Sequence, residues 1–154
     1  YDEGKSVVIF LNFEDSVQAV VSRLRKMKKF DKELAFIVGG QHHKTRQADI
    51  EAFNSDSKRI MIANIKAGGI GISLHDLQGN YPRASIISPN FSAFELVQAL
   101  GRVWRQGGKT KSYQNIVFAA GTIEEKACHR VQARIDNLST LNDADLRDGI
   151  QMFG

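Results

Sequence analysis

The stretch Ser6-Val7-Val8-Ile9-Phe10-Leu11-Asn12-Phe13 is a nearly continuous apolar run near the start of the chain. Strands that are buried on both faces of a parallel sheet have this composition, whereas half-exposed strands alternate apolar and polar residues. Apolar residues then recur at helical spacing between positions 17 and 24, and residues 14–16 are candidate caps for that helix. The opening of the chain therefore predicts a buried strand followed by a helix.

The same order of elements continues along the chain. Further strands are expected at residues 34–38, 59–64, 84–88 and 113–119. Helices are expected at residues 44–54, 92–105 and 122–138. In the first of them the candidate core contacts are Ala48, Ile50, Ala52 and Phe53. In the last, Thr122 and Glu125 form a capping box. Strands that alternate with helices predict an α/β fold, a three-layer domain with a central, mainly parallel sheet flanked by helices. No element is expected in the polar tail, residues 142–154.

Bulk properties narrow the class of protein. The 154 residues suit one domain, expected at 1–140 with a tail at 141–154, and the net charge of +4 is compatible with a nucleic-acid or nucleotide partner. The single cysteine, Cys128, excludes an internal disulfide and indicates a reducing, intracellular setting, cytoplasmic or nuclear. No apolar run approaches the ~20 residues of a membrane helix. Because the chain starts at Tyr1, we expect it to be part of a longer protein.

The helix expected at residues 92–105 carries a polar face. If Ser92 opens this helix, then Gln98, Arg102 and Arg105 stand at i, i+4 and i+7 on one side. Two guanidinium groups at that distance repel each other unless an anion lies between them, and a polyphosphate suits their forked donors. A solvated basic helix face is the alternative. Trp104, between the arginines, is expected to be a half-buried core aromatic, and stacking on a base is the alternative.

A glycine-rich loop, Gly68-Gly69-Ile70-Gly71, follows the strand expected at 59–64. Such a loop exposes backbone N–H groups and permits close approach of a phosphate. Its spacing differs from the G-x-G-x-x-G of dinucleotide-binding enzymes, which argues against a Rossmann-type nucleotide enzyme. A purely structural loop is the other alternative.

Other candidate sites fail on spacing. Gly107-Gly108-Lys109-Thr110 resembles the end of a P-loop, but Val103 stands where the first glycine is needed, so we expect a turn. The adjacent pairs His42-His43 and Cys128-His129 point apart on any regular element, so no metal site is expected. No catalytic nucleophile or general base is indicated.

Several of these stretches, in this order, resemble motifs of one family. The chain is similar to the C-terminal RecA-like lobe of superfamily 2 helicases and translocases, most closely the Swi/Snf-type ATPases, over about residues 6–138. Residues 6–13 resemble the opening strand of that lobe, and residues 67–74 resemble its AGGxGxNL motif. Residues 98–105 resemble its QxxGRxxR motif. A further match is the pattern G…R…I..FN, formed by Gly39-Gly40, Arg46, Ile50 and Phe53-Asn54.

The resemblance implies a second motor lobe of a nucleic-acid-dependent ATPase. Arg102 and Arg105 would be arginine fingers that stabilise transition-state charge on ATP. Gln98 would orient the nucleotide or the fingers, and Gly69 and Gly71 would lie beside the nucleotide. ATP and magnesium would be held mainly by an N-terminal lobe that this chain lacks, so the isolated lobe is expected to be inactive.

The resemblance also implies contacts with the nucleic-acid backbone, DNA more than RNA, at residues Gly40, Gln41, Asn64, Lys66 and Ser73. A non-catalytic module of the same fold that binds nucleic acid or another partner is the alternative. Three residues depart from the Swi/Snf pattern: Ser73 replaces an asparagine, Ser88 an aspartate and Gly108 a glutamine. A viral, phage or bacterial translocase is therefore as compatible with the sequence as a chromatin remodeller.

Overall fold

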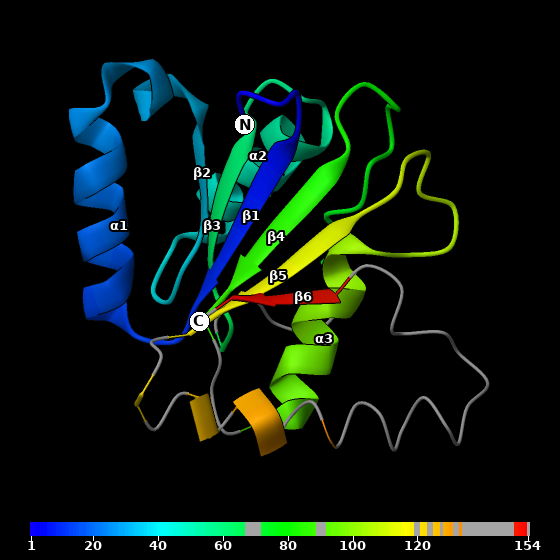
Figure 1. Ribbon diagram of the computed structural model, residues 1–154. Helices are drawn as coiled ribbons and strands as arrows, with labels where there is room; N and C mark the ends of the chain where they lie inside the picture. The colour runs from blue at the N-terminus through cyan, green and yellow to red at the C-terminus, as the bar shows by residue number, and fades with distance from the viewer. Residues whose placement is uncertain are drawn as a thin grey trace.

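The fold is built on a six-stranded sheet whose neighbouring strands are all parallel, in the order β2-β3-β1-β4-β5-β6 (Figure 1). The computed structural model describes residues 1–66, 72–88, 92–118, 121–122, 125–126, 128–130, 133 and 150–153. The strands are β1 (Ser6–Leu11), β2 (Leu34–Ile37), β3 (Ile60–Asn64), β4 (Arg83–Ile87), β5 (Tyr113–Val117) and β6 (Ile150–Phe153).

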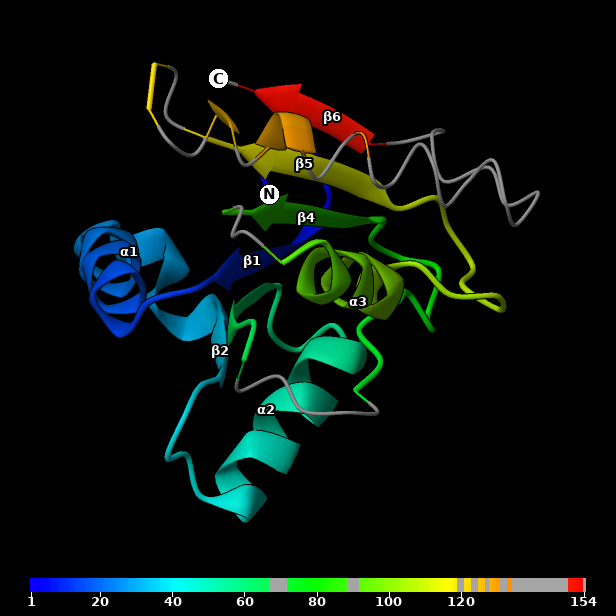
Figure 2. The same ribbon diagram turned by 90° about the horizontal axis from the view of Figure 1, so that it is seen from below.

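Helices cover both faces of this sheet. They are α1 (Glu14–Lys26), the short 3-10 helix η1 (Lys28–Glu33), α2 (His43–Asn54) and α3 (Ala93–Val103). The connection from β1 to β2 runs toward the β2 edge of the sheet. The connections from β2 to β3 and from β4 to β5 run toward the β6 edge. Because parallel crossovers are right-handed, α1 lies on one face, and α2 and α3 lie on the other (Figure 2). The expected three-layer RecA-like architecture is therefore confirmed.

Two apolar cores follow from these layers. One lies between the sheet, α2 and α3, and it contains Val8 and Phe10 of β1, Phe53 of α2 and Cys128. The other lies under α1 and η1; its buried residues are Leu11, Val17, Val21, Phe30, Leu34, Ile60 and Ile62. Since β1 sends side chains into both cores, its sequence has to be apolar at almost every position. Each fully buried side chain of this size contributes about 1.5–3 kcal/mol to folding.

The N-terminus of α1 and the buried face of α2 differ from the expectation. Phe13, with extended backbone, is the N-cap of α1 and makes no side-chain cap. The expected caps at 14–16 are wrong, because Glu14 and Asp15 lie in the first turn, where their charge is favourable to the helix dipole. In α2, Ala48 is exposed whereas Asp49 is buried, so Ala48 was assigned to the core incorrectly.

The C-terminal part also contains an element that the sequence did not suggest. Residues 150–153, in the stretch where no element was expected, form β6 and pair in parallel with β5. Most of the helix expected at 122–138 falls outside the described residues, although 125–126, 128–130 and 133 are helical. Glu125 accepts a hydrogen bond at 2.8 Å from the amide of Gly121, one residue before the expected cap. None of the helices in the described ranges has the length and hydropathy of a membrane span.

Candidate functional site

The arginine stretch lies at the C-terminal end of α3. This helix is capped by Ser92, whose Oγ accepts from the amide of Glu95, as expected. Gln98 is exposed, Arg102 is half-buried, and the opposite side of the helix is buried at Leu96, Ala99, Leu100 and Val103. The helix ends at Val103, and Trp104 is extended. The expectation of one helical face for all three polar residues is therefore wrong for Arg105, which lies beyond the helix.

Arg102 nevertheless belongs to a cluster of guanidinium groups. Its pKa is lowered by burial, then by the charge of Arg105, then by the charge of Arg46 on α2. Among the described residues, no hydrogen bond or ion pair reaches the guanidinium of Arg102. A half-buried cation close to the charges of two others is an arrangement that an anion with several oxygens would relieve.

A segment from another part of the chain holds the end of α3. The amide of Leu74 donates to the carbonyl oxygen of Arg102 at 2.8 Å, and Nη1 of Arg105 donates to Oγ of Ser73 at 2.6 Å. The carbonyl oxygen of Ser73 accepts in turn from Nδ2 of Asn54, the last residue of α2, at 3.1 Å. The segment that follows the glycine-rich loop is thus fixed between α2 and the arginines.

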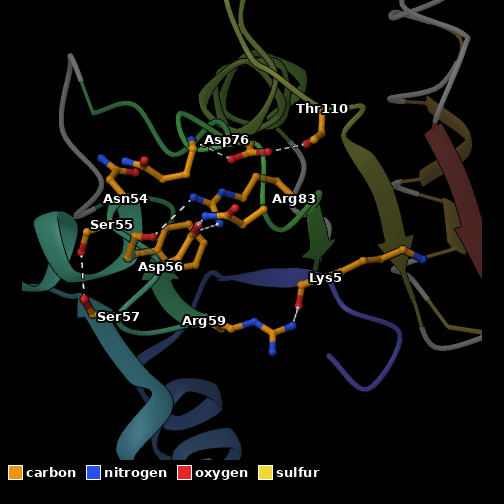
Figure 3. Close-up of polar contacts among 12 residues, drawn as sticks. Lys5, Asn54, Ser55, Asp56, Ser57, Arg59, Asp76, Arg83 and Thr110 are labelled. Atoms are coloured by element: carbon orange, nitrogen blue, oxygen red, sulfur yellow. Dashed lines mark hydrogen bonds and ion pairs between the residues drawn. The ribbon is translucent and has the colours of Figure 1, made fainter.

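Asp76 fixes the loop that follows Arg105. Its Oδ1 accepts from the amides of Gln78 and Gly79, and its Oδ2 accepts from the hydroxyl of Thr110 at 2.7 Å (Figure 3). Burial alone would raise the pKa of Asp76, but these hydrogen bonds and the charge of Arg83 outweigh it and hold that pKa below the usual range. The amide of Lys109 also donates to the carbonyl oxygen of Asp76.

The loop itself contains the expected turn. Gly107 has φ of +97°, a conformation that favours glycine, and the amide of Gly108 donates to the carbonyl oxygen of Arg105 at 3.1 Å. The reading of Gly107-Gly108-Lys109-Thr110 as a turn rather than a P-loop is confirmed. Trp104 is 59% exposed, so the expectation of a half-buried core aromatic is wrong.

Arg105 lies at the amino edge of the sheet, whereas Arg46 lies near the start of α2, after the carboxyl end of β2. Arg105 lines a cavity of about 40 Å³ together with Arg83, the first residue of β4, and Ser112, which directly precedes β5. Ligands held within a single parallel sheet usually bind at the opposite, carboxyl edge. Figure 1 shows that α3 starts beyond the carboxyl end of β4 and runs back along the sheet.

The residues expected to contact nucleic acid are divided between the two edges. Gly40 and Gln41 follow β2, Asn64 ends β3 and Lys66 comes shortly after it, so these four lie at the carboxyl edge. Ser73 lies instead with Arg105 at the amino edge. Gly69 and Gly71 fall outside the described residues.

Two of the carboxyl-edge residues also have local structural roles. Oδ1 of Asn64 accepts from the amide of Lys66 at 3.0 Å, and Oε1 of Gln41 accepts from the amide of Val38. Nε2 of Gln41 donates to Oδ2 of the buried Asp49 at 3.1 Å. Gly40 is exposed and has φ of +70°. The side chains of Gln41 and Asn64 therefore shape the loops of this edge, whereas Lys66 is exposed.

Sequence reasoning did not place two contributors to the cluster. Arg46 and Asn54 were noted only as parts of a motif, yet Arg46 lies close enough to lower the pKa of Arg102, and Asn54 holds Ser73. Their spacing of eight residues along α2, which puts them on one side of the helix, was the available signal.

The described part of the chain contains no group of three or more His, Cys, Asp or Glu side chains that could hold a metal ion. The Nδ1 of His42 accepts from the amide of Lys44 and caps α2.

Comparisons with known proteins identify the family of this chain. The family described as the helicase conserved C-terminal domain matches residues 1–107. A protein of Acanthamoeba polyphaga mimivirus that is provisionally named an ATP-dependent RNA helicase is 37% identical over 146 residues, which cover 94% of this chain and 26% of that protein. The DNA repair and recombination protein RAD54-like of Drosophila erecta is 31% identical over 145 residues, covering 92% of this chain and 18% of that protein.

A solved structure shows the same fold. The crystal structure of the C-terminal part of the Fun30 ATPase domain superposes with a TM-score of 0.70 and 26% identity, covering 84% of this chain and 39% of that one. The chain thus spans a minor part of the length of each relative. It belongs to the helicase conserved C-terminal domain family and has the RecA-like fold of that domain in superfamily 2 proteins of the Swi/Snf type.

Proposed function

We propose that this chain is the second motor lobe of a nucleic-acid-dependent ATPase and that Arg102 and Arg105 act on ATP bound at a cleft with another lobe. The observation that carries the proposal is the cluster of Arg46, Arg102 and Arg105, in which no described carboxylate pairs with Arg102. Arg105 lies at the amino edge of the sheet, away from the carboxyl edge where a single parallel sheet usually binds its ligands, and this supports a site completed by a second lobe.

The cluster fits a polyphosphate by its donors and charge. Guanidinium groups offer fixed, forked N–H donors that match phosphate oxygens. Arginines aimed at a transferring phosphoryl group stabilise the charge that spreads over its oxygens, and one such residue can be worth ~10³–10⁵ in rate. Magnesium, which neutralises charge between the phosphates when bound, would be held mainly by the other lobe. In this lobe, Gln98 stands one turn from Arg102 and would orient the nucleotide or the arginines.

The carboxyl edge is the proposed contact with nucleic acid. Gly40, Gln41, Asn64 and Lys66 follow or end strands at this edge, opposite Arg105. Backbone amides and small polar side chains at such an edge suit contacts to phosphate and sugar without reading base sequence. We expect DNA rather than RNA, on the similarity to RAD54-like proteins, and an intracellular site of action.

Two preparations test this function. The first is the chain alone, and the second is the longer protein in which it is joined to an ATP-binding lobe. Each is assayed for ATP hydrolysis with magnesium and with duplex DNA, single-stranded DNA or RNA. The proposal expects no turnover by the chain alone and stimulated turnover by the joined lobes, highest with DNA. Arginine-dependent turnover by the chain alone, or joined lobes that no nucleic acid stimulates, would overturn it.

A further inference from the structure

The hydroxyl of Ser73 is the hydrogen-bond acceptor for the exposed guanidinium of Arg105, at 2.6 Å. Ser73 is itself held in place on both sides. Its carbonyl oxygen accepts from Asn54, and the next residue, Leu74, is fully buried and donates its amide to Arg102. The position of the hydroxyl is thus set by α2, by the core and by the end of α3.

Two carboxylates of this part of the fold are engaged by other groups. Asp76 accepts from two amides and from Thr110, so its oxygens face its own turn and the loop of residues 104–112. Asp56 pairs with the buried Arg83 at 2.9 Å. Within the described residues, the recorded partner of the Arg105 side chain is therefore a neutral hydroxyl rather than an acid.

The choice of acceptor matters for an arginine that has to bind phosphate. A carboxylate would neutralise the guanidinium and compete with the anion, since charged hydrogen bonds are roughly twice as strong as neutral ones. A hydroxyl fixes the direction of the fork and leaves its charge available. The contact is also exposed, so water can replace it when the guanidinium moves.

We propose that Ser73 is a positioning residue for Arg105: it holds the guanidinium in a fixed direction, without neutralising it, until the phosphate of a completed site takes its place. This inference rests on the proposed function of Arg105. It assigns Ser73 to the nucleotide side of the lobe, although the sequence had suggested a contact with nucleic acid. Because Ser73 follows the glycine-rich loop and Leu74 is bonded to Arg102, a shift of this one segment would move both arginines together.

The test compares three substitutions of Ser73 in the protein with both lobes, at saturating nucleic acid. Ser73→Ala removes the acceptor and should lower kcat about tenfold, as for a loss of orientation, with KM for ATP little changed. Ser73→Thr keeps a hydroxyl and should restore most of the turnover. Ser73→Asp supplies an ion-pair partner, so turnover should fall toward that of Arg105→Ala while the melting temperature is unchanged or higher. Ser22→Ala on α1 is the control for an exposed serine.

The outcomes distinguish a failure of this inference from a failure of the proposed function of Arg105. If Arg105→Ala abolishes turnover but Ser73→Ala and Ser73→Asp both leave kcat near that of the parent, Ser73 does not position Arg105 and only this inference fails. A rise in KM with unchanged kcat would also contradict it, because Ser73 would then be a binding contact. If Arg105→Ala itself retains turnover, the proposed function fails.

Discussion

The backbone carbonyl of Arg102 accepts a hydrogen bond at 2.8 Å from the amide of Leu74, a residue that follows the glycine-rich loop. Carbonyl groups in the last turn of a helix have no partner within the helix, so this contact satisfies one of them from outside. The carbonyl of Leu100 is satisfied twice, by the amide of Trp104 and by Nε2 of Gln114. The end of α3 is therefore set by tertiary contacts. One of them links the backbone of Arg102 to Leu74.

Gly101 is expected to weaken α3, and the packing of this lobe does not require a glycine at this position. A Cβ added at this exposed position would meet nothing within 4 Å, and its φ is not positive. Gly101→Ala should therefore raise the free energy of unfolding by about 0.5–1 kcal/mol, because alanine loses less backbone entropy. Urea denaturation of the chain measures this. Gly40→Ala, where φ is +70°, is the matched control and should destabilise. A destabilised Gly101→Ala variant would mean that the end of α3 is not the open helix described.

Trp104 should report on the environment of the arginines. It is the single tryptophan of the chain and is 59% exposed. The emission of the folded chain should therefore resemble that of indole in water and should be quenched efficiently by acrylamide. Trp104→Phe should change the free energy of unfolding by no more than about 0.5 kcal/mol, as for surface positions. A blue-shifted, protected emission would show that the indole is buried.

The buried pair of Arg83 and Asp56 should be far more sensitive than the ion pairs of the surface. The two side chains are 1% and 6% exposed and 2.9 Å apart, and the guanidinium of Arg83 also lies over the ring of Phe53. Arg83→Met keeps most of the volume but leaves Asp56 as a buried charge without its ion-pair partner, which should cost about 3–5 kcal/mol. Chemical denaturation gives the value.

Lys29→Met is the control for this substitution. Lys29 pairs with Asp2 at 2.8 Å, but both side chains are well exposed. Its loss should cost between about 0 and 1 kcal/mol. Equal effects of the two substitutions would contradict the burial of Arg83.

Asp76 should make stability depend on pH in the acid range. Its pKa is held below the usual value, so its stabilising effect is present above about pH 4 and is lost as the pH falls through the folded-state pKa. Asp76→Asn should cost about 1–3 kcal/mol at neutral pH, because an amide cannot accept all of the hydrogen bonds. The difference from the parent should shrink below pH 4. A difference that stays constant from pH 7 to pH 3 would exclude this role.

The sequence predicted the layers of the fold because burial on both faces leaves a plain signal. The apolar run 6–13 and its successors indicated the strands, and the helical spacing of apolar residues indicated the helices. The ends of elements depended on contacts distant in sequence. The end of α3 at Val103 is an example, since it depends on Leu74 and Gln114.

The sequence named candidate site residues, but it did not predict how they are arranged. Spacing identified Arg102 and Arg105, whereas the extended backbone at Trp104 removed Arg105 from the helix. Nothing local to Ser73 shows that its partner stands 32 positions away. Asp49 was missed for a similar reason, because a buried carboxylate is stable only with partners such as Lys58, at 2.7 Å, and the amide of Phe36.

The central claim is that Arg102 acts on ATP held by a second lobe. The most direct measurement is nucleic-acid-stimulated kcat, at saturating ATP, for the protein with both lobes carrying Arg102→Ala. Arg23→Ala on α1 removes an equal charge from an exposed position and serves as the control. The account predicts that Arg102→Ala lowers kcat by ~10³ or more, with an unchanged melting temperature, while Arg23→Ala retains the parent rate. Stimulated turnover by Arg102→Ala that stays within about twofold of the parent, less than 0.5 kcal/mol in the barrier, would contradict it.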